Sequence, residues 1–337
     1  MKTLRIGIIG TGRWARIHAQ AYSRMPEARI FGIADINVKK AQAFAKEVKA
    51  EYYYDNFVEL LHNPEIDAVS IVVPPKYFSQ LIVEAAYNGK HVLCEKPLAL
   101  TYEEAANIYS VIERKGVKLQ VGFDRRFNPL MVALKRICEE RKFGETKIVI
   151  SRRYGNYLTY YDISSWRFDY EEGGGVLCSL CVHDFDLITW ITGHNIAELM
   201  IVGGPLFYGG NAEDYCLATL SLSNGSLASV EGCMKPIQSN SSLEIIFRDA
   251  RIEADIANSQ LKIHQNGHTK VKQMQKILTV DHSVRAFLDS IINDTTTCTT
   301  KEEMLATVKV LEVARKIIRS SFQSDKKIAI GFHSFRK

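Results

Sequence analysis

Short apolar runs alternate with amphipathic segments over the first third of the chain. Strand-like runs lie at 4–10, 29–35, 66–73, 91–96 and 118–123, and helical patterns lie between them at 14–25, 38–50, 79–89 and 101–116. Thr101 followed by Glu104 is a capping box that begins the last helix, and Gly116 ends it. Buried-type strands that alternate with helices predict an α/β fold with a doubly wound parallel sheet.

The pattern changes after about residue 122. Helices are expected at 129–140 and from about 178 to 192, with alternating strand-like runs at 147–155, 217–223, 226–232, 243–249, 251–255 and 260–265. Asn-Gly pairs at 224–225 and 266–267 are typical of antiparallel hairpins. Two amphipathic helices follow, at 284–293 and 301–320. We therefore expect two domains, residues 1–122 with the parallel sheet and residues 123–337 with an open, mainly antiparallel α+β sheet.

Composition narrows the class of protein. The 337 residues are 46% hydrophobic and 24% charged with a net charge of +5, and the basic residues are dispersed, with no basic run longer than an isolated pair such as Lys39–Lys40. This distribution argues against a nucleic-acid partner, and no apolar run approaches the roughly 20 residues of a membrane span. The first residues lack the apolar core of a signal peptide. Seven cysteines without framework spacing indicate reduced thiols, so we expect a cytoplasmic protein.

A dinucleotide-binding fingerprint follows the first strand. The loop that begins the first helix has the G-x-G-x-x-G/A spacing and contains the candidate cofactor residues Gly10, Thr11, Gly12, Arg13 and Trp14. Its glycines permit a tight turn and a close approach to pyrophosphate at the helix N-terminus. Asp35 ends the second strand, 23 residues after Gly12, where a carboxylate accepts hydrogen bonds from ribose hydroxyls. This carboxylate repels a 2′-phosphate and favours NAD, with NADP as the alternative because Arg13, Lys39 and Lys40 offset the repulsion. These features predict a Rossmann domain.

The segment HVLCEKP at 91–97 places charged residues at the end of a strand of the same sheet. Ligands of such sheets lie beyond the carboxyl ends of the strands, so Glu95 and Lys96 are expected to face them. Pro97 biases Lys96 toward an extended backbone. A lysine near nicotinamide can stabilise the oxyanion that develops as hydride leaves a substrate alcohol.

The chain resembles the Gfo/Idh/MocA oxidoreductases, a family named after glucose–fructose oxidoreductase, inositol dehydrogenase and rhizopine catabolism. The matching segments run in order along most of the chain and include GIIGTGRWA, GKHVLCEKPLALT, VGFDRRFNP, SSWRFD, GGGVL and HDFDLITWITG. The resemblance implies a Rossmann domain followed by an α/β domain whose open sheet often serves oligomer contacts. It also implies hydride transfer between nicotinamide and a sugar, a polyol or a related carbonyl compound.

The same resemblance assigns roles to individual residues. Lys96 matches the catalytic lysine of the family, and His183 matches the histidine that usually acts as general acid and base. Histidine suits that role because its unperturbed pKa lies near neutrality. Further positions match parts of the site that bind cofactor or substrate: Pro74, Glu95, Trp166 and Arg167 for the cofactor, and Arg126 for the substrate. Tyr161, from the segment rich in tyrosine and arginine, and Ser179, close to His183, are additional candidates for substrate contacts.

Three positions depart from the family pattern. Ser179 stands where many members have an aspartate four residues before the histidine, and Cys181 replaces a glycine. The segment at 74–78, PPKYF, replaces P-N-x-x-H. Positions 179, 183 and 186 share one face of the expected helix, so Asp186 is a candidate to support His183 in catalysis, as is neighbouring Asp184. A solvated or hydrogen-bonded helix carboxylate is an equally good interpretation of Asp186.

The two cysteines at 178 and 181, together with His183, suggest a metal site at first sight. They supply at most three neighbouring ligands, without a second pair at zinc-binding spacing. Free cysteines are commonly buried, so we expect Cys178 and Cys181 to pack and predict no metal.

The sequence therefore predicts an NAD(P)-dependent oxidoreductase that acts on a secondary alcohol or ketone of a carbohydrate-like small molecule. The segment 152–167, rich in tyrosine and arginine, suits sugar rings and hydroxyls, although oligomer contacts explain it almost as well. We expect a homodimer or homotetramer formed through the C-terminal sheet. Two alternatives stay open: redox-neutral chemistry with tightly bound NAD, such as glycoside hydrolysis or aldose–ketose exchange, and a catalytically decayed NAD-binding sensor or partner protein.

Overall fold

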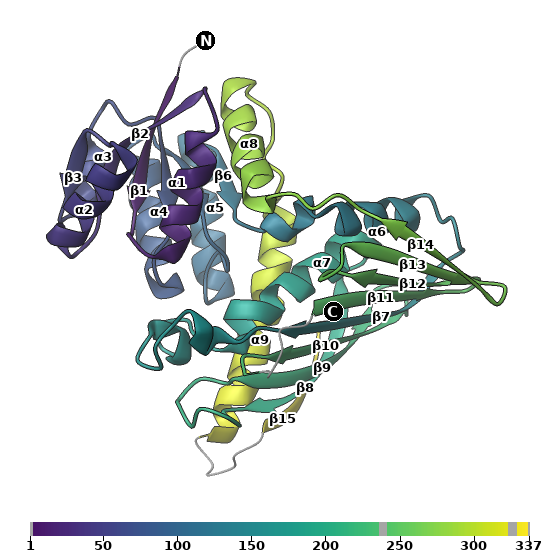
Figure 1. Cartoon of the computed structure of the whole chain (residues 1–337). Coiled ribbons are helices and arrows are strands. Elements are labelled where there is room, and N and C mark those ends of the chain that lie inside the picture. The colour runs from purple at the N-terminus through teal and green to yellow at the C-terminus, as the bar shows by residue number, and fades with distance from the viewer. Residues whose placement is uncertain (1–2, 236–240, 323–328, 336–337) are drawn as a thin grey trace. The chain divides into compact units, whose positions relative to one another are not determined.

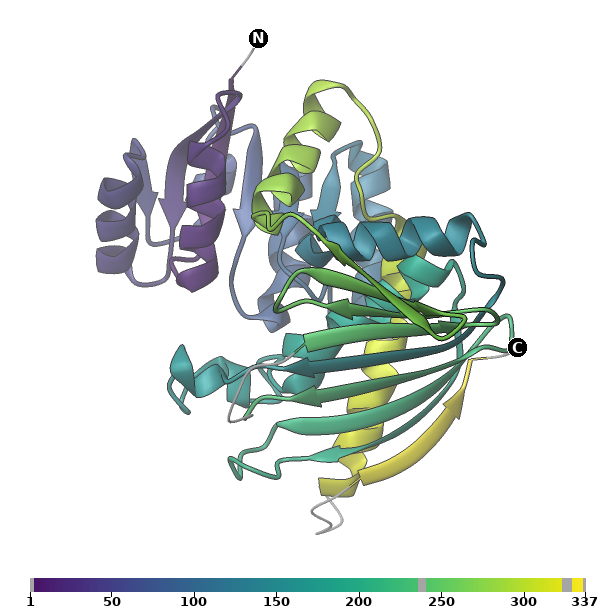
Figure 2. The same cartoon turned by 45° about the vertical axis from the view of Figure 1, so that its right-hand side comes forward.

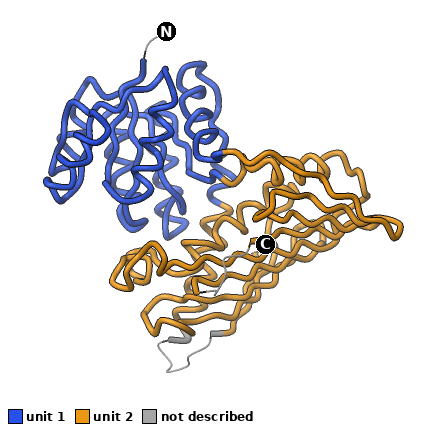
Figure 3. The backbone as a smooth tube through the Cα atoms, viewed as in Figure 1, with its two compact units in different colours: residues 1–124, 278–305 blue, residues 125–277, 306–337 orange. Residues whose placement is uncertain are grey.

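The chain divides into two compact units. The computed structural model describes residues 3–235, 241–322 and 329–335. The first unit comprises residues 1–124 and 278–305, and the second comprises residues 125–277 and 306–337 (Figure 3). Residues 278–305 thus group with the first unit although they follow residues 125–277 of the second unit along the chain. The division into domains of residues 1–122 and 123–337 stays a prediction.

The first unit contains a six-stranded parallel sheet in the order β3-β2-β1-β4-β5-β6. Its elements are β1(Leu4–Ile9), α1(Arg13–Ser23), β2(Ala28–Ala34), α2(Val38–Val48), β3(Tyr52–Tyr54), α3(Phe57–His62), β4(Ala68–Ile71), α4(Phe78–Tyr87), β5(His91–Cys94), α5(Tyr102–Lys115) and β6(Leu119–Val121) (Figure 1). The predicted doubly wound sheet is confirmed, and the expected capping box begins α5. The short β3 and α3 were not predicted because each is shorter than the run of residues over which a strand or helix periodicity can be recognised.

A late helix completes the core of this unit. The helix α8(Thr279–Ile292) contributes Val284, Phe287 and Leu288 to the cluster that contains Ala15, Ala19 and other residues of α1 and β1. Gln120 of β6 donates hydrogen bonds to the carbonyl and hydroxyl oxygens of Ser283. The apolar face of α8 therefore packs inside the first unit.

The second unit is built on a nine-stranded sheet in the order β14-β13-β12-β11-β7-β10-β9-β8-β15 (Figure 2). The strands are β7(Thr146–Tyr154), β8(Ile196–Gly204), β9(Tyr215–Leu222), β10(Leu227–Cys233), β11(Ser241–Phe247), β12(Arg251–Asp255), β13(Gln260–Gln265), β14(His268–Gln273) and β15(Ala329–Ser334). All its pairings are antiparallel except β7 with β10, so the predicted mainly antiparallel sheet is confirmed. Both Asn-Gly pairs form the expected hairpins.

Helices cover one face of this sheet (Figure 2). They are α6(Pro129–Glu139), α7(Val182–Thr192) and α9(Lys301–Phe322). The first five residues of α9 belong to the first unit. Side chains of α9 lie close to the backbone of β8 and β15, since a Cβ at Gly203 or Gly331 would approach Ile318 or Ile317. No helix among the described residues is long and apolar enough to cross a membrane.

Candidate functional site

The loop between β1 and α1 presents backbone atoms to a ligand. Gly10 has a φ of 102°, and a Cβ there would lie 2.4 Å from the carbonyl oxygen of Val72. Gly12 is the N-cap of α1, and no described atom lies within 4 Å of the place that its Cβ would occupy. The first turn of α1 carries no acidic residue, and no described side chain caps it. An uncapped helix N-terminus at a glycine turn suits pyrophosphate.

The carboxylate of Asp35 is held in place by the loop between β1 and α1 and by its own loop. Its Oδ2 accepts hydrogen bonds from the backbone N–H of Thr11 at 3.0 Å and from the Thr11 hydroxyl at 2.6 Å. Its Oδ1 accepts one from the backbone N–H of Asn37 at 2.9 Å. An ionised carboxylate has about four acceptor positions, so Oδ1 keeps one for a ribose hydroxyl. Arg13 is exposed and Trp14 is half-buried beside this loop.

Glu95 and Lys96 follow directly after β5, as expected. The carboxylate Oε1 of Glu95 lies 3.0 Å from Nε2 of the buried His18 on α1. A Cβ at Gly122 would lie 2.8 Å from the same oxygen, so glycine leaves room for the carboxylate. Lys96 is half-buried, and its peptide bond to Pro97 is cis, a feature that the sequence interpretation did not foresee.

The departure at 74–78 has a packing explanation. Half-buried Pro74 precedes a short 3₁₀ turn, Pro75–Tyr77, that leads into α4. Phe78 is the first residue of α4 and is fully buried. A core phenylalanine therefore occupies the last position of the segment that departs from the expected pattern.

His183 belongs to a buried helix that begins with a π-helical turn. Residues Leu177–Cys181 form this turn, in which the N–H of Val182 donates to the carbonyl oxygen of Leu177. The single α-helix expected from about residue 178 is therefore corrected, because the wider turn changes the angular spacing between Ser179 and His183. Both side chains are buried, with 3% and 4% exposed. The π turn is a feature often found at functional sites.

Two aspartates next to His183 are held by buried arginines. Asp186 accepts hydrogen bonds from Nε of Arg126 at 3.0 Å and from its Nη2 at 2.6 Å. Asp184 accepts from Nε and Nη2 of Arg153 on β7 at 2.8 and 2.6 Å. These pairs anchor the helix from two sides, which supports a positioning role for Asp186. Arg126, expected to contact substrate, is 4% exposed.

An aromatic cluster lies in the same unit. The Arg167 guanidinium lies over the rings of Tyr161 and Trp166, with centroid distances of 4.4 and 4.2 Å. The neighbouring Tyr157 ring lies 5.7 Å from Tyr161, and its hydroxyl donates to the backbone oxygen of Ser179 at 3.2 Å. Burial raises the pKa of Tyr157 although the Arg167 guanidinium opposes this change. The structure thus brings together Tyr161, Trp166 and Arg167, and Tyr157 links them to the π turn.

The cysteines of the π turn face different partners. Cys178 lies 2.9 Å from Nη1 of Arg315 on α9, whereas Sγ of Cys181 lies 3.4 Å from Sγ of Cys216 on β9. The contact with Cys216 and burial raise the pKa of Cys181 well above its ordinary value. Within the described ranges, no group of three or more His, Cys, Asp or Glu side chains is arranged to hold a metal ion.

Some buried polar residues near these positions were not singled out from the sequence. They are His18, Arg153, Glu213 and Arg315. The signal for His18 was its place on the apolar face of α1, between Ala15 and Tyr22, where a histidine needs polar partners. The other three became meaningful only through partners far along the chain.

Comparison with known proteins agrees with this architecture. The family model "Oxidoreductase family, NAD-binding Rossmann fold" matches residues 4–123, and "GFO/IDH/MocA C-terminal domain" matches residues 131–253. The uncharacterized oxidoreductase YrbE of Bacillus subtilis (strain 168) is 32% identical over 241 residues, which cover 70% of this chain and 69% of YrbE. The myo-inositol 2-dehydrogenase of Thermotoga maritima is 27% identical over 258 residues, 75% of each chain.

Solved structures share the fold at lower identity. A levoglucosan dehydrogenase in complex with NADH and L-sorbose superposes with a TM-score of 0.87 at 19% identity, covering 100% of both chains. The predicted NAD-binding domain and the predicted class, a nicotinamide-dependent dehydrogenase, are therefore confirmed at the level of the family. Its two matched domains and the relative YrbE show that the chain belongs to the Gfo/Idh/MocA family of oxidoreductases.

Proposed function

We propose that this oxidoreductase moves a hydride between nicotinamide C4 and the carbon of a secondary alcohol in a sugar, an inositol or a related polyol. The observation that carries the proposal is the place of Lys96, two residues after the end of β5 in the NAD-binding sheet. Ligands of such sheets lie beyond the carboxyl ends of the strands. Relatives named as dehydrogenases of inositols and of levoglucosan support the substrate class.

In the oxidation direction, the alcohol carbon gives its hydride to NAD⁺ and its hydroxyl proton to His183. The carbon–oxygen bond becomes a carbonyl, and the Lys96 ammonium stabilises the negative charge that develops on the oxygen. The burial of His183 on a helix anchored by two ion pairs supports this assignment, because a general base needs a fixed direction. Asp186 acts through Arg126 as a positioning residue.

The cofactor loop supports NAD as the preferred nicotinamide. The uncapped helix N-terminus at Gly12 suits the pyrophosphate, and the fixed Asp35 carboxylate suits the ribose hydroxyls. The same negative charge disfavours a 2′-phosphate. We place Glu95, Pro74 and the Trp166–Arg167 pair at the nicotinamide half, and Tyr161 and Ser179 among the substrate contacts.

The proposal is tested by following NADH absorbance with a panel of myo-inositol, scyllo-inositol, levoglucosan and UDP-N-acetylglucosamine. Lys96→Ala and His183→Ala are each expected to lower kcat by about 10² to 10⁴-fold, the usual contribution of such groups. Unchanged turnover in both variants would remove the assigned roles. Substrate conversion without net NADH would instead favour the redox-neutral alternative.

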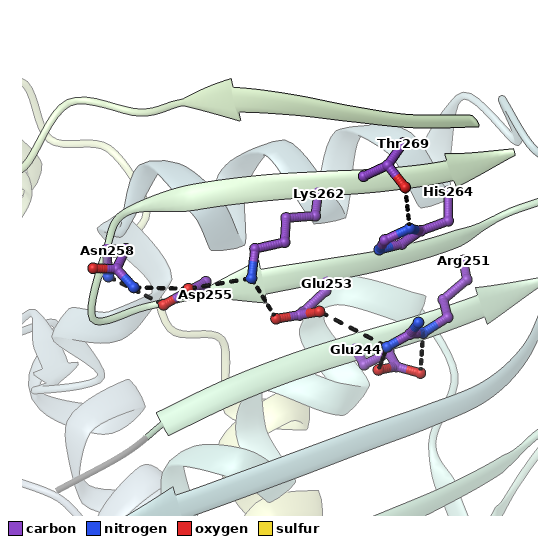
Figure 4. Close-up of polar contacts among 8 residues, drawn as sticks. All are labelled: Glu244, Arg251, Glu253, Asp255, Asn258, Lys262, His264 and Thr269. Carbon is purple, nitrogen blue, oxygen red and sulfur yellow. Dashed lines mark hydrogen bonds and ion pairs between the residues drawn. The ribbon is translucent and has the colours of Figure 1, made fainter.

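The open face of the nine-stranded sheet supports self-association. One part of this face is apolar and exposed; it carries Ile148, Met200, Leu217, Leu227, Ile330 and Phe332. The part over β11–β13 is charged, with Arg251 bonded to Glu244 and Lys262 bonded to Glu253 and Asp255 (Figure 4). Exposed apolar patches of this kind mark protein interfaces. We propose a homo-oligomer that buries the apolar part.

Free thiols support a reducing compartment. All seven cysteines are unbridged, although Cys181 and Cys216 lie within 3.4 Å of each other. Disulfides persist in oxidising compartments and are rare in the cytosol. We therefore propose a cytoplasmic location, which fractionation of the native cells would test.

A further inference from the structure

Four polar side chains form a hydrogen-bonded chain through the interior of the first unit. The hydroxyl of Tyr22 lies 2.9 Å from Oγ of Ser70, and this oxygen lies 3.2 Å from Nδ1 of His18. On the other side of the ring, Nε2 of His18 lies 3.0 Å from Oε1 of Glu95. Tyr22, His18 and Ser70 are at most 2% exposed, and the Glu95 side chain is 13% exposed. These hydrogen bonds connect α1, β4 and the end of β5.

The chemistry of the end group sets the direction of every bond. An ionised carboxylate only accepts hydrogen bonds, so in a neutral His18 the Nε2 atom carries the proton and donates a hydrogen bond to Glu95. Nδ1 then accepts from the Ser70 hydroxyl, and Ser70 Oγ accepts from the Tyr22 hydroxyl. Burial raises the pKa of Tyr22, which keeps its hydroxyl protonated as the donor. Each of the four side chains has a partner, which a buried polar network requires.

The position of His18 in α1 gives this network a consequence. The N-terminus of α1 is the end that suits the pyrophosphate, and His18 lies on the same rigid helix, six residues after Gly12. The hydrogen bond from His18 Nε2 ends at Glu95, the residue that precedes Lys96. Gly122 leaves room for the Glu95 carboxylate, since a Cβ there would lie 2.8 Å from Oε1. The helix that receives one end of the cofactor is thus tied to the segment that bears the lysine.

We propose that His18 is a positioning residue for the nicotinamide half of the cofactor. Its Nε2–H holds the Glu95 carboxylate and so fixes the direction of the Glu95–Lys96 segment. The inference rests on the proposed function in one respect, the roles assigned to Glu95 and Lys96. A histidine that served only the core would affect all parts of the cofactor alike, or none of them.

Two substitutions separate the two ring nitrogens. In His18→Gln the amide nitrogen reaches about as far as Nε2 and can still donate to Glu95, whereas in His18→Asn the amide reaches only about as far as Nδ1, near Ser70. Isothermal titration calorimetry then compares NAD⁺ with ADP, which contains the pyrophosphate but no nicotinamide ribose. Thermal unfolding of each variant reports whether the fold is kept.

His18→Asn is expected to weaken NAD⁺ binding about ten-fold, the effect of losing one hydrogen bond to a charged group. Its affinity for ADP should stay within about two-fold of the wild type, and His18→Gln should rescue NAD⁺ binding to a similar margin. Equal NAD⁺ affinity in the two variants, or a parallel loss for NAD⁺ and ADP, would overturn the proposal.

Ser70→Ala provides a second route if His18→Asn does not fold. It removes the donor that fixes the tautomer, so NAD⁺ should bind about three-fold more weakly while ADP is unaffected, and an unchanged NAD⁺ affinity contradicts the inference. Because these titrations contain no substrate, their failure is distinct from that of the proposed function. That function fails separately if Lys96→Ala keeps full turnover on the substrate panel.

Discussion

Arg126 and Asp186 form a two-point ion pair inside the second unit, with side chains that are 3% and 1% exposed. The guanidinium donates through Nε and Nη2, one bond to each carboxylate oxygen. Asp184 makes the same kind of pair with Arg153 on β7 and also accepts from the Ser151 hydroxyl at 2.7 Å. The helix that carries His183 is therefore fixed by charged contacts on two sides, and its orientation depends on both.

Removal of Arg126 should destabilise the protein strongly. Arg126→Leu leaves the Asp186 carboxylate buried without its cation, which typically costs about 3 to 5 kcal/mol of unfolding free energy. Urea denaturation would measure the loss. The double variant Arg126→Leu/Asp186→Leu should recover most of it, because replacing both partners removes the stranded charge.

Asp186→Asn distinguishes the positioning role from direct participation. A positioning role predicts that kcat falls together with stability, and that the shape of the pH–rate profile is kept. Stopped assays from pH 5 to 9 at a temperature where the variant is folded would show this. A profile that loses one limb would instead assign Asp186 to the proton transfer itself.

The hydrogen bond from the Thr11 hydroxyl to Asp35 is expected to influence the preference for NAD⁺ over NADP⁺. Thr11→Val keeps the side-chain shape but removes the 2.6 Å hydroxyl donor, so the carboxylate is held less firmly. NAD⁺ affinity should fall about ten-fold and the preference for NAD⁺ over NADP⁺ should narrow, since a hydrogen bond to a charged group contributes about 1.5 kcal/mol at the lower end of its range. Competition binding with both cofactors would measure the ratio. Thr11→Ser keeps the hydroxyl, and an effect as large in this variant would refute the explanation.

The sequence predicted those parts of the fold whose signals are local. The glycine turn at Gly10, the capping box at Thr101 and the Asn-Gly hairpins each depend on a few neighbouring residues, and all of them formed. The strands β8 and β15 were missed. The alternation of β8 is weak at its glycines, and β15 is defined by its pairing with β8.

The candidate site shows the same limit. Positions near the nucleotide loop followed from a motif with a known backbone geometry. The ion pair between Asp186 and Arg126 could not be predicted in this way, because the two residues lie 60 positions apart. Helix spacing alone suggested His183 as the partner of Asp186. The π turn also escaped, since it changes the register within a segment that reads as uniformly apolar. Long-range pairing and local helix distortion are properties that one sequence does not encode in its periodicity.

The apolar part of the open sheet face is the surface through which we expect copies of the protein to associate. Met200 and Leu227 are 52% and 55% exposed, so a glutamate at each position is tolerated in a monomer but places charge in a buried interface. Met200→Glu/Leu227→Glu should shift the protein toward monomer in size-exclusion chromatography with light scattering. Val271→Glu on the opposite edge strand β14 is the control and should leave the mass unchanged. An unchanged mass in the double variant would move the interface elsewhere.

The buried carboxyl of Glu213 predicts a pH dependence of stability. Its Oε1 accepts from the N–H of Leu177 at the start of the π turn, and its Oε2 makes no hydrogen bond to the described residues. Burial raises the pKa of Glu213 above its ordinary value of 4.5, although the nearby Arg315 guanidinium opposes the change. The folded protein therefore holds this proton more tightly than the unfolded chain does. The resulting stability is complete below pH 4.5 and is lost as the pH rises through the raised pKa.

Glu213→Gln keeps the acceptor for Leu177 and removes the ionisation. The variant should therefore become more stable relative to the wild type as the pH rises above 4.5, and the difference in melting temperature should increase with pH. The difference in unfolding free energy should reach about 1.4 kcal/mol for each unit by which the pKa of Glu213 is raised. Differential scanning calorimetry between pH 4 and 9 would measure the two curves, with exposed Glu302→Gln as the matched control. Parallel curves for wild type and Glu213→Gln would mean that the carboxyl ionises in the folded protein as it does in water. In that case the charge would be stabilised by Arg315, and the π turn would be anchored by an ion pair rather than by a neutral acid.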